Sequence, residues 1–407
     1  DQAFFCEGMA EEIMNALMHA DGIRVASRLS AFSARREQRD LASIGRALSV
    51  GQILEGSVRV AGDRLRVTAQ LIDVESGYQL WSERYDREAA DIFAVQDEIA
   101  QSVLEAVQAN LSSGAARVQQ RPRVRNIEAY RHYLKGRYFR YTKNNHAGAR
   151  EEYGNSVALD PDYGPAWVGL AETTVMCAGY SILPTEQAYA AAREALGKAE
   201  ALQGESAEAH YVEGMLACVT KDWDKALAAL RRAVELRPDH VQSLGWLGFV
   251  NSVLQRPDEA LSYVELAREA DPLASYAYAM TACTLAQLRR HEAGRGYAER
   301  AVELDADNTL AVWILGMTRF ASGQIDAGIE ALGRAAELAR RGSHLLGTLG
   351  WALATAGRTA EAETVLEELQ ARGADAPAAI AEAWLLGALG RLDEAFRVVD
   401  RCLDQGQ

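Results

Sequence analysis

The sequence has no run of about 18 or more apolar residues, and its first 20 residues lack the positively charged start of a signal peptide. We therefore expect neither a membrane-spanning helix nor a secretory leader. The five cysteines lie far apart, without a Cys-x-x-Cys pair or a cysteine and histidine cluster with zinc spacing. This pattern predicts buried, reduced thiols and no metal site, and unpaired cysteines favour the cytoplasm over the periplasm.

The motifs of common enzyme classes are also missing. There is no phosphate-binding loop, dinucleotide-binding glycine pattern, nucleophile elbow or paired-histidine metal motif, and the seven histidines are scattered. We expect no catalytic residue and no cofactor in this chain. The sequence begins with Asp1 rather than Met, which suggests a part of a longer polypeptide that has further domains.

What the sequence does have is a period of 34 residues. Small residues at fixed positions allow two helices of a repeat to approach closely, so the period predicts stacked helical hairpins. The first set of small residues is Gly214, Gly248, Ala282, Gly316 and Gly350. The second set, twelve residues later, is Ala226, Ala260, Gly294, Gly328 and Ala362. Large apolar residues follow the first set by 16 positions: Leu230, Val264, Leu332 and Leu366.

This pattern, with proline near the end of the repeat at Pro238 and Pro272, resembles the tetratricopeptide repeat. The frame extends over residues 129–407 with an inserted loop at 179–187 and a slip of one residue in the last repeat. We expect about eight helical hairpins. The fold class predicted for this part is an all-α solenoid.

Residues 1–111 have a different pattern, which predicts a small α+β domain. Alternating apolar residues over 52–60, 64–74 and 78–85 indicate an antiparallel meander of three strands. Amphipathic helices are expected over 7–19 and 92–111, a short helix after Asp40, and a short strand over 23–26.

The amino-acid sequence of this segment, from FFCEGMAEEIMNAL to DIFAVQDEIAQSV, resembles the TolB-amino-terminal-like domain, which is related to the flagellar FlgO domain. In bacterial regulators this domain precedes tetratricopeptide repeats and often follows a winged-helix DNA-binding domain, as in CadC-like proteins, or an adenylate cyclase domain. The chain lacks the family's apolar first strand, so we expect an open sheet edge and a possible homodimer through this domain.

Charge is unevenly distributed along the chain. Residues 1–111 have a net charge of −7, residues 112–150 of +9, and residues 151–407 of −16. The predicted organisation is therefore a domain at 1–111, a basic linker at 112–128 and the solenoid at 129–407. The basic and aromatic belt at 117–143 has a composition that can bind single-stranded nucleic acid. Charge complementarity to the acidic regions 1–111 and 151–407 is the favoured explanation, so we expect no nucleic acid partner.

In the repeat family, positions 2, 5, 9, 12 and 13 of each unit face a concave groove. Here these positions are aromatic and apolar, without the Lys, Arg and Asn of a carboxylate clamp. The hypothesis is a non-catalytic regulatory module whose groove binds a protein or peptide segment; burial of the same side chains between repeats is the other interpretation. The alternative function is the regulatory part of an adenylate or guanylate cyclase. The candidate groove residues are Tyr211, Met215, Phe249, Tyr276, Trp313, Met317, Phe320, Trp351 and Trp384.

Overall fold

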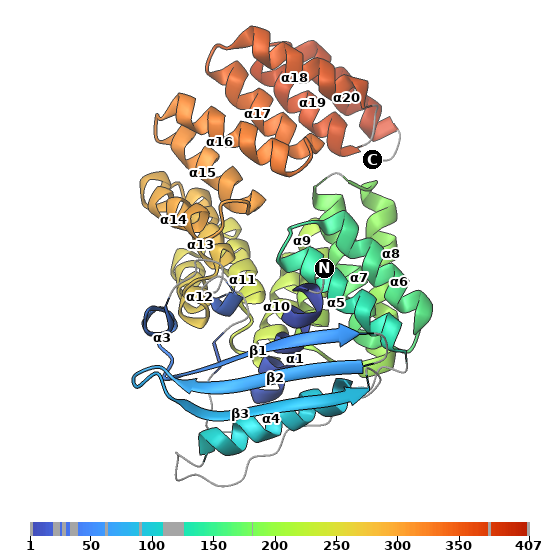
Figure 1. Ribbon diagram of the computed structural model, residues 1–407. Helices are drawn as coiled ribbons and strands as arrows, with labels where there is room; N and C mark the ends of the chain where they lie inside the picture. The colour runs from blue at the N-terminus through green and yellow to red at the C-terminus, as the bar shows by residue number, and fades with distance from the viewer. Residues whose placement is uncertain are drawn as a thin grey trace. The chain divides into compact units, whose positions relative to one another are not determined.

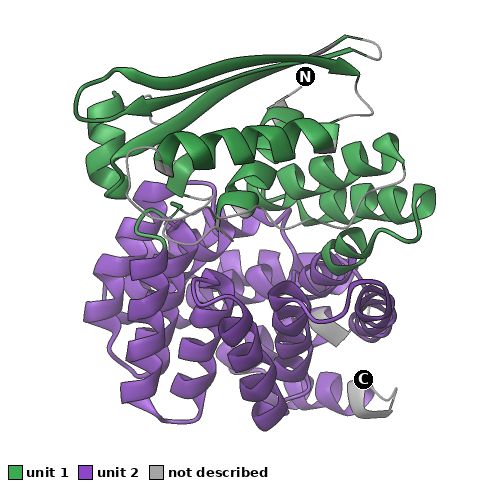
Figure 2. Cartoon of the chain, turned by 90° about the horizontal axis from the view of Figure 1, so that it is seen from below, with its two compact units in different colours: residues 1–169, 271–273 green, residues 170–270, 274–407 purple. Residues whose placement is uncertain are grey.

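The computed structural model describes residues 3–18, 25–26, 30–32, 40–61, 64–88, 92–108, 126–180, 182–372 and 376–404. The chain forms two compact units, coloured separately in Figure 2. Unit 1 comprises residues 1–169 and 271–273, and unit 2 comprises residues 170–270 and 274–407. The first helical hairpin of the solenoid thus packs with the amino-terminal segment, whereas the boundaries predicted from sequence at 111 and 129 stay a prediction.

Unit 1 contains a three-stranded antiparallel sheet in the order β1-β2-β3, shown in blue in Figure 1. Its strands are β1 (Gln52–Ala61), β2 (Arg64–Asp73) and β3 (Gln79–Glu88). Val67 in β2 lies opposite Val58 in β1 and Tyr85 in β3. In β2 every second side chain is buried: Leu65, Val67, Ala69 and Leu71. The predicted meander with one buried face is confirmed, because alternation by two follows from the strand geometry.

Helices cover the buried face of this sheet. Helix α1 contacts β1, and α4 contacts β2 and β3. The α3 helix begins where predicted: Asp40 caps it by accepting a hydrogen bond from the Ser43 backbone N–H at 2.9 Å. The bounds of the unit 1 helices are α1 (Ala3–Met18), α3 (Leu41–Leu48), α4 (Ile92–Gln108), α5 (Ile127–Tyr141) and α6 (His146–Leu159).

Two predicted elements of unit 1 differ from the structure. Helix α1 begins four residues before the predicted start, because Phe5 is buried one turn before Met9 and continues the same apolar face. Of the strand predicted over 23–26, Val25 and Ala26 are not in a strand, and residues 23 and 24 lie outside the described residues.

Helix α1 packs against α5 through a close approach and an ion pair. A Cβ atom at Gly8 would lie 2.5 Å from Leu134 Cδ2, so any larger residue there would displace the Leu134 side chain. Beside this contact, the Arg137 guanidinium pairs with Glu11 and donates to the Tyr133 hydroxyl at 2.8 Å. Both Arg137 and Glu11 are largely shielded from solvent. These contacts explain why the α5–α6 hairpin belongs to unit 1.

From α5 to α20 the described helices follow one another in eight successive pairs, as predicted. A small antiparallel sheet is therefore followed by a long all-helical solenoid (Figure 1). The remaining helices are α7 (Gly164–Gly179), α8 (Thr185–Gln203), α9 (Ala207–Val219), α10 (Trp223–Leu236), α11 (Val241–Val253), α12 (Pro257–Ala270), α13 (Ser275–Gln287), α14 (His291–Leu304), α15 (Thr309–Ala321), α16 (Ile325–Leu338), α17 (Ser343–Thr355), α18 (Thr359–Ala371), α19 (Ala376–Ala388) and α20 (Leu392–Asp404).

The small residues of the period lie where the two helices of a hairpin meet. A Cβ atom at Gly214 would be 2.6 Å from Leu230 Cγ, and one at Gly316 would be 2.7 Å from Leu332 Cγ. The large apolar residue of each repeat therefore fills the space that the small residue leaves open. This is the packing that the period predicted.

Each hairpin from α9 onward turns through one residue with a left-handed backbone. The first three of these residues have side chains and the last three are glycines, 33 or 34 positions apart. They are Lys221 (φ 57°), Gln255 (57°), Arg289 (58°), Gly323 (85°), Gly357 (78°) and Gly390 (76°).

The inserted loop brings distant parts of unit 2 together. It is shorter than predicted, because α8 begins at Thr185 and takes up the last residues of the insertion. At its start, the Tyr180 carbonyl oxygen lies against Gly342, where a Cβ atom would be only 2.4 Å away. The turn between α16 and α17 therefore needs glycine at this position. Within the described residues, no helix is long and apolar enough to span a membrane.

Candidate functional site

The hairpins of unit 2 form two layers. The inner layer consists of the first helix of each pair, α9, α11, α13, α15, α17 and α19, and the outer layer of α10, α12, α14, α16, α18 and α20. Three pairs of neighbouring inner helices pack together, α11 with α13, α13 with α15, and α17 with α19, whereas among the described residues no two outer helices pack comparably. Closer packing in one layer favours curvature of the stack toward that layer, so the inner layer is the candidate concave side.

The two layers differ sharply in charge. Helices α11, α13 and α17 have no Asp, Glu, Lys or Arg, and α15 and α19 have one each, Arg319 and Glu382. Every outer helix has between four and six such residues. Because a charged group is costly to remove from water, a face without charges is the one that can be covered by an apolar partner.

Three of the nine predicted groove residues lie in the core instead. The exposed fractions are 4% for Tyr211, 3% for Met215 and 9% for Phe320. Tyr211 packs against the buried His240 ring at 5.3 Å, and Phe320 against Trp351 at 5.2 Å between ring centroids. Buried side chains reach a partner only after rearrangement, so these three are excluded from the candidate surface.

The other predicted residues are at least partly accessible. Phe249, Tyr276, Trp313, Met317 and Trp351 are half-buried, and they come from the four consecutive inner helices α11, α13, α15 and α17. Trp384 in α19 is 56% exposed. We call the five half-buried residues the inner aromatic row. Binding of a partner segment to this row stays a prediction.

Inner helices α15 and α17 do not approach each other as closely as their neighbours do. Two ring pairs bridge them: Trp313 with His344 at 5.8 Å, and Phe320 with Trp351. By contrast, α17 and α19 meet at Gly347, where a Cβ atom would lie 2.6 Å from Ala381 Cβ. The large aromatic side chains therefore also fill a wide interface, in agreement with the interpretation that they pack between repeats.

Trp313 fills the interface between hairpins and is also partly accessible. Its ring packs against the apolar clusters on either side of α15. Its indole N–H is shielded from solvent and has no acceptor among the described residues. A buried donor without an acceptor is destabilising by about 1–3 kcal/mol, and because this N–H is shielded from solvent, a bound segment would reach it only after rearrangement.

Titratable groups near the inner layer are held neutral by burial. Burial lowers the pKa of His344, and it lowers the pKa of His240 well below the usual histidine value. The pKa values of the Cys218 and Cys283 thiols are raised to about 12, also by burial. These thiols are protonated at neutral pH and are poor nucleophiles. Within the described residues no group of three or more His, Cys, Asp or Glu side chains could hold a metal ion.

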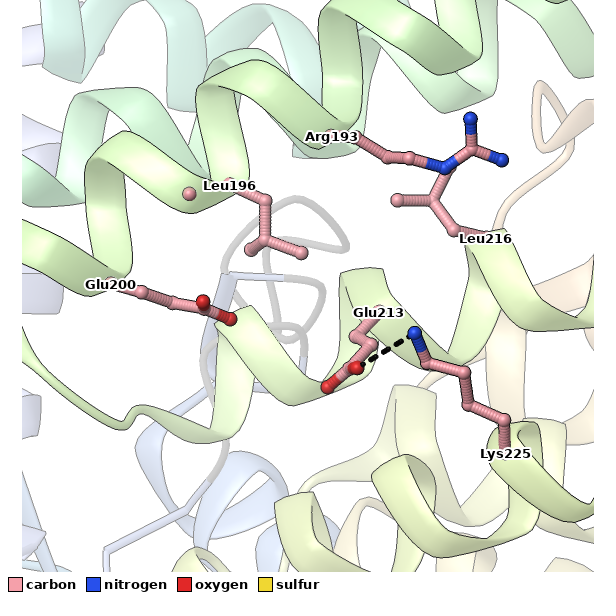
Figure 3. A pocket seen from close by; sticks show the side chains of 7 residues that line it. Arg193, Leu196, Glu200, Glu213, Leu216 and Lys225 are labelled. Carbon is pink, nitrogen blue, oxygen red and sulfur yellow. Dashed lines mark ion pairs between the residues drawn. The ribbon is translucent and has the colours of Figure 1, made fainter.

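A shallow cavity of about 170 Å³ lies among α8, α9 and α10 (Figure 3). Two leucines and four charged side chains line it, and Lys225 Nζ lies 3.2 Å from a Glu213 carboxylate oxygen. The charges are of both signs and are largely solvated. Such a cavity offers little apolar surface to a small ligand.

The described part of the basic belt is engaged within unit 1. Lys135 pairs with Glu152, Arg131 with Glu128 at 3.1 Å, and Arg137 with Glu11. Residues 117–125 lie outside the described residues. These internal pairs support the explanation that the belt complements acidic groups of the same chain.

Sequence reasoning missed one aromatic neighbour of the row, Trp246, whose ring meets the Phe249 ring edge-on at 5.7 Å. His344, at groove position 2 of its repeat, lies against Trp313. Trp246 is at repeat position 6, outside the positions used for the prediction. The signal that could have found it is the absence of charge along the whole of α11.

Comparisons with known proteins agree with the repeat pattern. Two models described as tetratricopeptide repeat match the chain, over residues 207–240 and 315–377. The first match begins in the register set by Gly214. The chain therefore contains tetratricopeptide repeats, which indicate a protein-interaction module.

Similarity to individual proteins is partial. The chain is 41% identical over 114 residues to a protein of Rhizobium meliloti (strain 1021) described as "Putative adenylate cyclase 3", which covers 28% of this chain and 19% of that protein. The chain thus spans about a fifth of that relative's length. The resemblance of residues 1–111 to the TolB-amino-terminal-like domain stays a prediction.

Similarity to solved structures is partial as well. An anaphase-promoting complex assembly, Cut9–Hcn1, is 18% identical, with a TM-score of 0.42, and the match covers 56% of this chain and 43% of that one. YrrB, described as a tetratricopeptide-repeat protein with an unusual peptide-binding site, is 22% identical with a TM-score of 0.28, over 45% of this chain and 90% of that one. MamA is 24% identical with a TM-score of 0.29, over 42% and 94%.

Proposed function

We propose that this chain is a non-catalytic interaction module of a bacterial signalling protein, and that it binds a protein segment on the inner layer of its solenoid. The observation that carries the proposal is the inner aromatic row, which lies on four helices with a single charged residue, Arg319. A solvated face of four successive helices would ordinarily include charged residues, as the outer layer does.

The chemistry of the row indicates the kind of segment. Between Phe249 and Trp351 the accessible side chains of the inner helices include aromatic rings and the Met317 thioether, and Arg319 is the single charged residue. An extended, uncharged segment with bulky apolar side chains fits this surface, because its side chains are removed from water on binding.

The proposal can be tested by selecting peptides from a displayed random library on the immobilised chain. We expect the selected peptides to be rich in apolar residues and poor in charge. The double variant Trp313→Ala with Met317→Ala should bind them about tenfold more weakly or worse, since buried aromatic residues dominate binding at such surfaces. Calorimetric titration of the selected peptides measures the effect.

Trp223→Ala is the matched control, because Trp223 is a half-buried tryptophan on the outer helix α10. It should leave peptide affinity unchanged. If the double variant binds as tightly as the unmodified chain, or if it melts far earlier without any change in affinity, the row is a structural interface and the proposal fails.

A second candidate function is the regulatory part of a nucleotide cyclase. The 41% identity over 114 residues to a protein described as a putative adenylate cyclase favours it, and the catalytic domain would lie outside this chain. The two functions are compatible. Cyclic nucleotide formation by the polypeptide of the complete gene, measured with and without the residues of this chain, tests the second one; equal activity with no response to a selected peptide contradicts it.

A further inference from the structure

Two departures from the repeat pattern meet in unit 2. One is the insertion between α7 and α8. The other is the turn between α16 and α17, where Arg340 (φ 53°) and Arg341 (φ 58°) are the only two successive non-glycine residues with a left-handed backbone among the described residues. The Tyr180 carbonyl oxygen, at the start of the insertion, lies against Gly342 of that turn. We call this contact the clasp.

Local contacts hold each side of the clasp. On the α7 side, the Ile182 backbone N–H donates to the Cys177 carbonyl oxygen at 2.7 Å. On the α16 side, the Arg341 guanidinium donates to both carboxylate oxygens of Glu368 in α18, at 2.9 and 2.6 Å. A left-handed backbone is unfavourable for a residue with a side chain. The turn therefore keeps its conformation because the ion pair and the clasp hold it.

The clasp joins the two ends of a curved stack. Four hairpins, from α9–α10 to α15–α16, lie between its two sides in the chain. Packed helices are about 8–10 Å apart, so in a straight stack the two sides would be separated by about 40 Å. Because Tyr180 and Gly342 touch, these hairpins follow an arc that the clasp closes. The arc contains the inner helices α11, α13 and α15, and α17 begins directly beside the clasp at Ser343.

Helix α17 couples the clasp to the inner aromatic row. Gly342 is the residue that precedes the first turn of α17. In that turn the His344 ring lies against the Trp313 ring at 5.8 Å, and the Trp313 indole N–H is shielded from solvent. Because a helix moves as a stiff unit, a shift of the start of α17 moves His344 relative to Trp313. The clasp therefore controls how much of Trp313 a bound segment can reach.

We propose that the clasp regulates binding of a protein segment to the inner aromatic row, an inference that rests on the proposed function. The closed clasp holds the start of α17 against Trp313. When the clasp opens, His344 withdraws and the row accepts the segment. A segment that binds the open form more tightly shifts the equilibrium toward that form, so any change that opens the clasp raises the apparent affinity for the segment.

The variant Gly342→Ala opens the clasp selectively. A Cβ atom at this position would lie 2.4 Å from the Tyr180 carbonyl oxygen, too close for the contact to persist. The Gly342 backbone (φ −49°, ψ 144°) is in a region that alanine adopts without strain, so the new methyl group acts on the contact alone. The matched control is Gly333→Ala in α16, where a Cβ atom would meet nothing within 4 Å.

The test selects the displayed peptide library on the unmodified chain and, separately, on the Gly342→Ala chain. The peptides obtained are then titrated calorimetrically against both chains. We expect Gly342→Ala to bind them about tenfold more tightly, because more of the chain is in the open form, and Gly333→Ala to bind them as the unmodified chain does. Without peptide, amide hydrogen exchange in the first turn of α17 should be about tenfold faster in Gly342→Ala.

A second variant weakens the clasp by different chemistry. Arg341→Ala removes the pair with Glu368 that holds the turn, and it should change affinity and hydrogen exchange in the same direction by about threefold, since a partly exposed ion pair is weak. Arg358→Ala is its control, because it removes a similar pair with Glu361 away from the clasp. Circular dichroism checks that helicity is retained; if Gly342→Ala loses helicity, Arg341→Ala decides.

The proposal is overturned if folded Gly342→Ala binds the peptides no more tightly than the unmodified chain, or if hydrogen exchange in α17 is unchanged. In either case the proposed function still stands when the peptides lose affinity for the double variant Trp313→Ala with Met317→Ala. If neither chain selects a peptide, the proposed function fails and this inference fails with it. Peptides that bind only the Gly342→Ala chain support both.

Discussion

Glycine has opposite effects on the packed side and on the solvated side of the solenoid helices. At Gly316 in the inner layer, a Cβ atom would lie 2.7 Å from Leu332 Cγ and 3.0 Å from a backbone nitrogen. At Gly296 and Gly333 in the outer layer, a Cβ atom would meet nothing within 4 Å. The comparison shows that glycine is required where helices cross, whereas on the solvated side it only weakens the helix.

Charge separates the layers in a similar way. Outer residues form exposed ion pairs along the stack, for example Arg341 with Glu368 at 2.6 Å and Arg391 with Glu363 at 3.0 Å. Exposed pairs of this kind contribute roughly 0–1 kcal/mol each. The stability of the hairpins therefore comes mainly from apolar packing between the layers, and the outer charges mainly keep the array soluble.

The largest effect is expected from filling the inner crossing. Gly316→Leu should destabilise the protein by about 3 kcal/mol, because the new side chain overlaps Leu332 and adjacent backbone. Urea denaturation measures the change. Gly333→Leu on the outer side of α16 is the control and should not destabilise; equal losses in both variants would contradict the comparison of layers.

The next effect concerns pH and the cap of inner helix α11. Burial keeps His240 neutral in the folded chain, while the unfolded chain takes up a proton near pH 6.5. Stability must therefore fall as the pH drops below about 6.5, since the unfolded state binds more protons. We expect a loss of about 1 kcal/mol from this residue by pH 5.5.

His240→Asn separates this effect from other acid effects. His240 accepts a hydrogen bond from the Ser243 backbone N–H as the helix cap, and asparagine can replace that bond without titrating. Between pH 7 and 5.5 the free energy of unfolding should fall less for the variant than for the unmodified chain. A difference that is independent of pH would exclude His240 as a source of acid sensitivity.

A smaller gain is expected in the outer layer. Gly296→Ala should stabilise the protein by about 0.5–1 kcal/mol, because alanine favours the helix and the added methyl group has space. Thermal unfolding followed by circular dichroism detects the shift. Gly248→Ala, in the inner layer, should have the opposite sign, because its Cβ would be 2.4 Å from Val264.

The smallest effect is expected at the turns between the layers. Arg289 adopts a left-handed backbone at a position where the later hairpins have glycine. Arg289→Gly should stabilise by about 0.5 kcal/mol, the relief of backbone strain less the entropy that glycine adds to the unfolded chain. Gly323→Arg should destabilise by a similar amount. If the two changes have the same sign, backbone conformation is not the cause.

The hairpins and the meander could be predicted because both follow from local periodicity. A period of 34 with small residues at Gly214 and Gly316 leaves few alternatives to close helix crossings, and alternation in β2 leaves few alternatives to a half-buried strand. The exposure of individual groove residues could not be predicted. Tyr211 and Phe320 occupy repeat positions that were assigned to the groove, yet they are buried.

The sequence by itself determined the helical hairpins, their register and the charge of each layer, because these depend on residues close together in the chain. The tertiary structure decided which aromatic residues stay accessible, since that depends on spacing between hairpins: wide between α15 and α17, close at Gly347. It also decided that the α5–α6 hairpin packs with helix α1 in unit 1 and that Tyr180 lies against Gly342. Contacts between residues so far apart depend on accumulated small rotations along the stack, which no local pattern encodes.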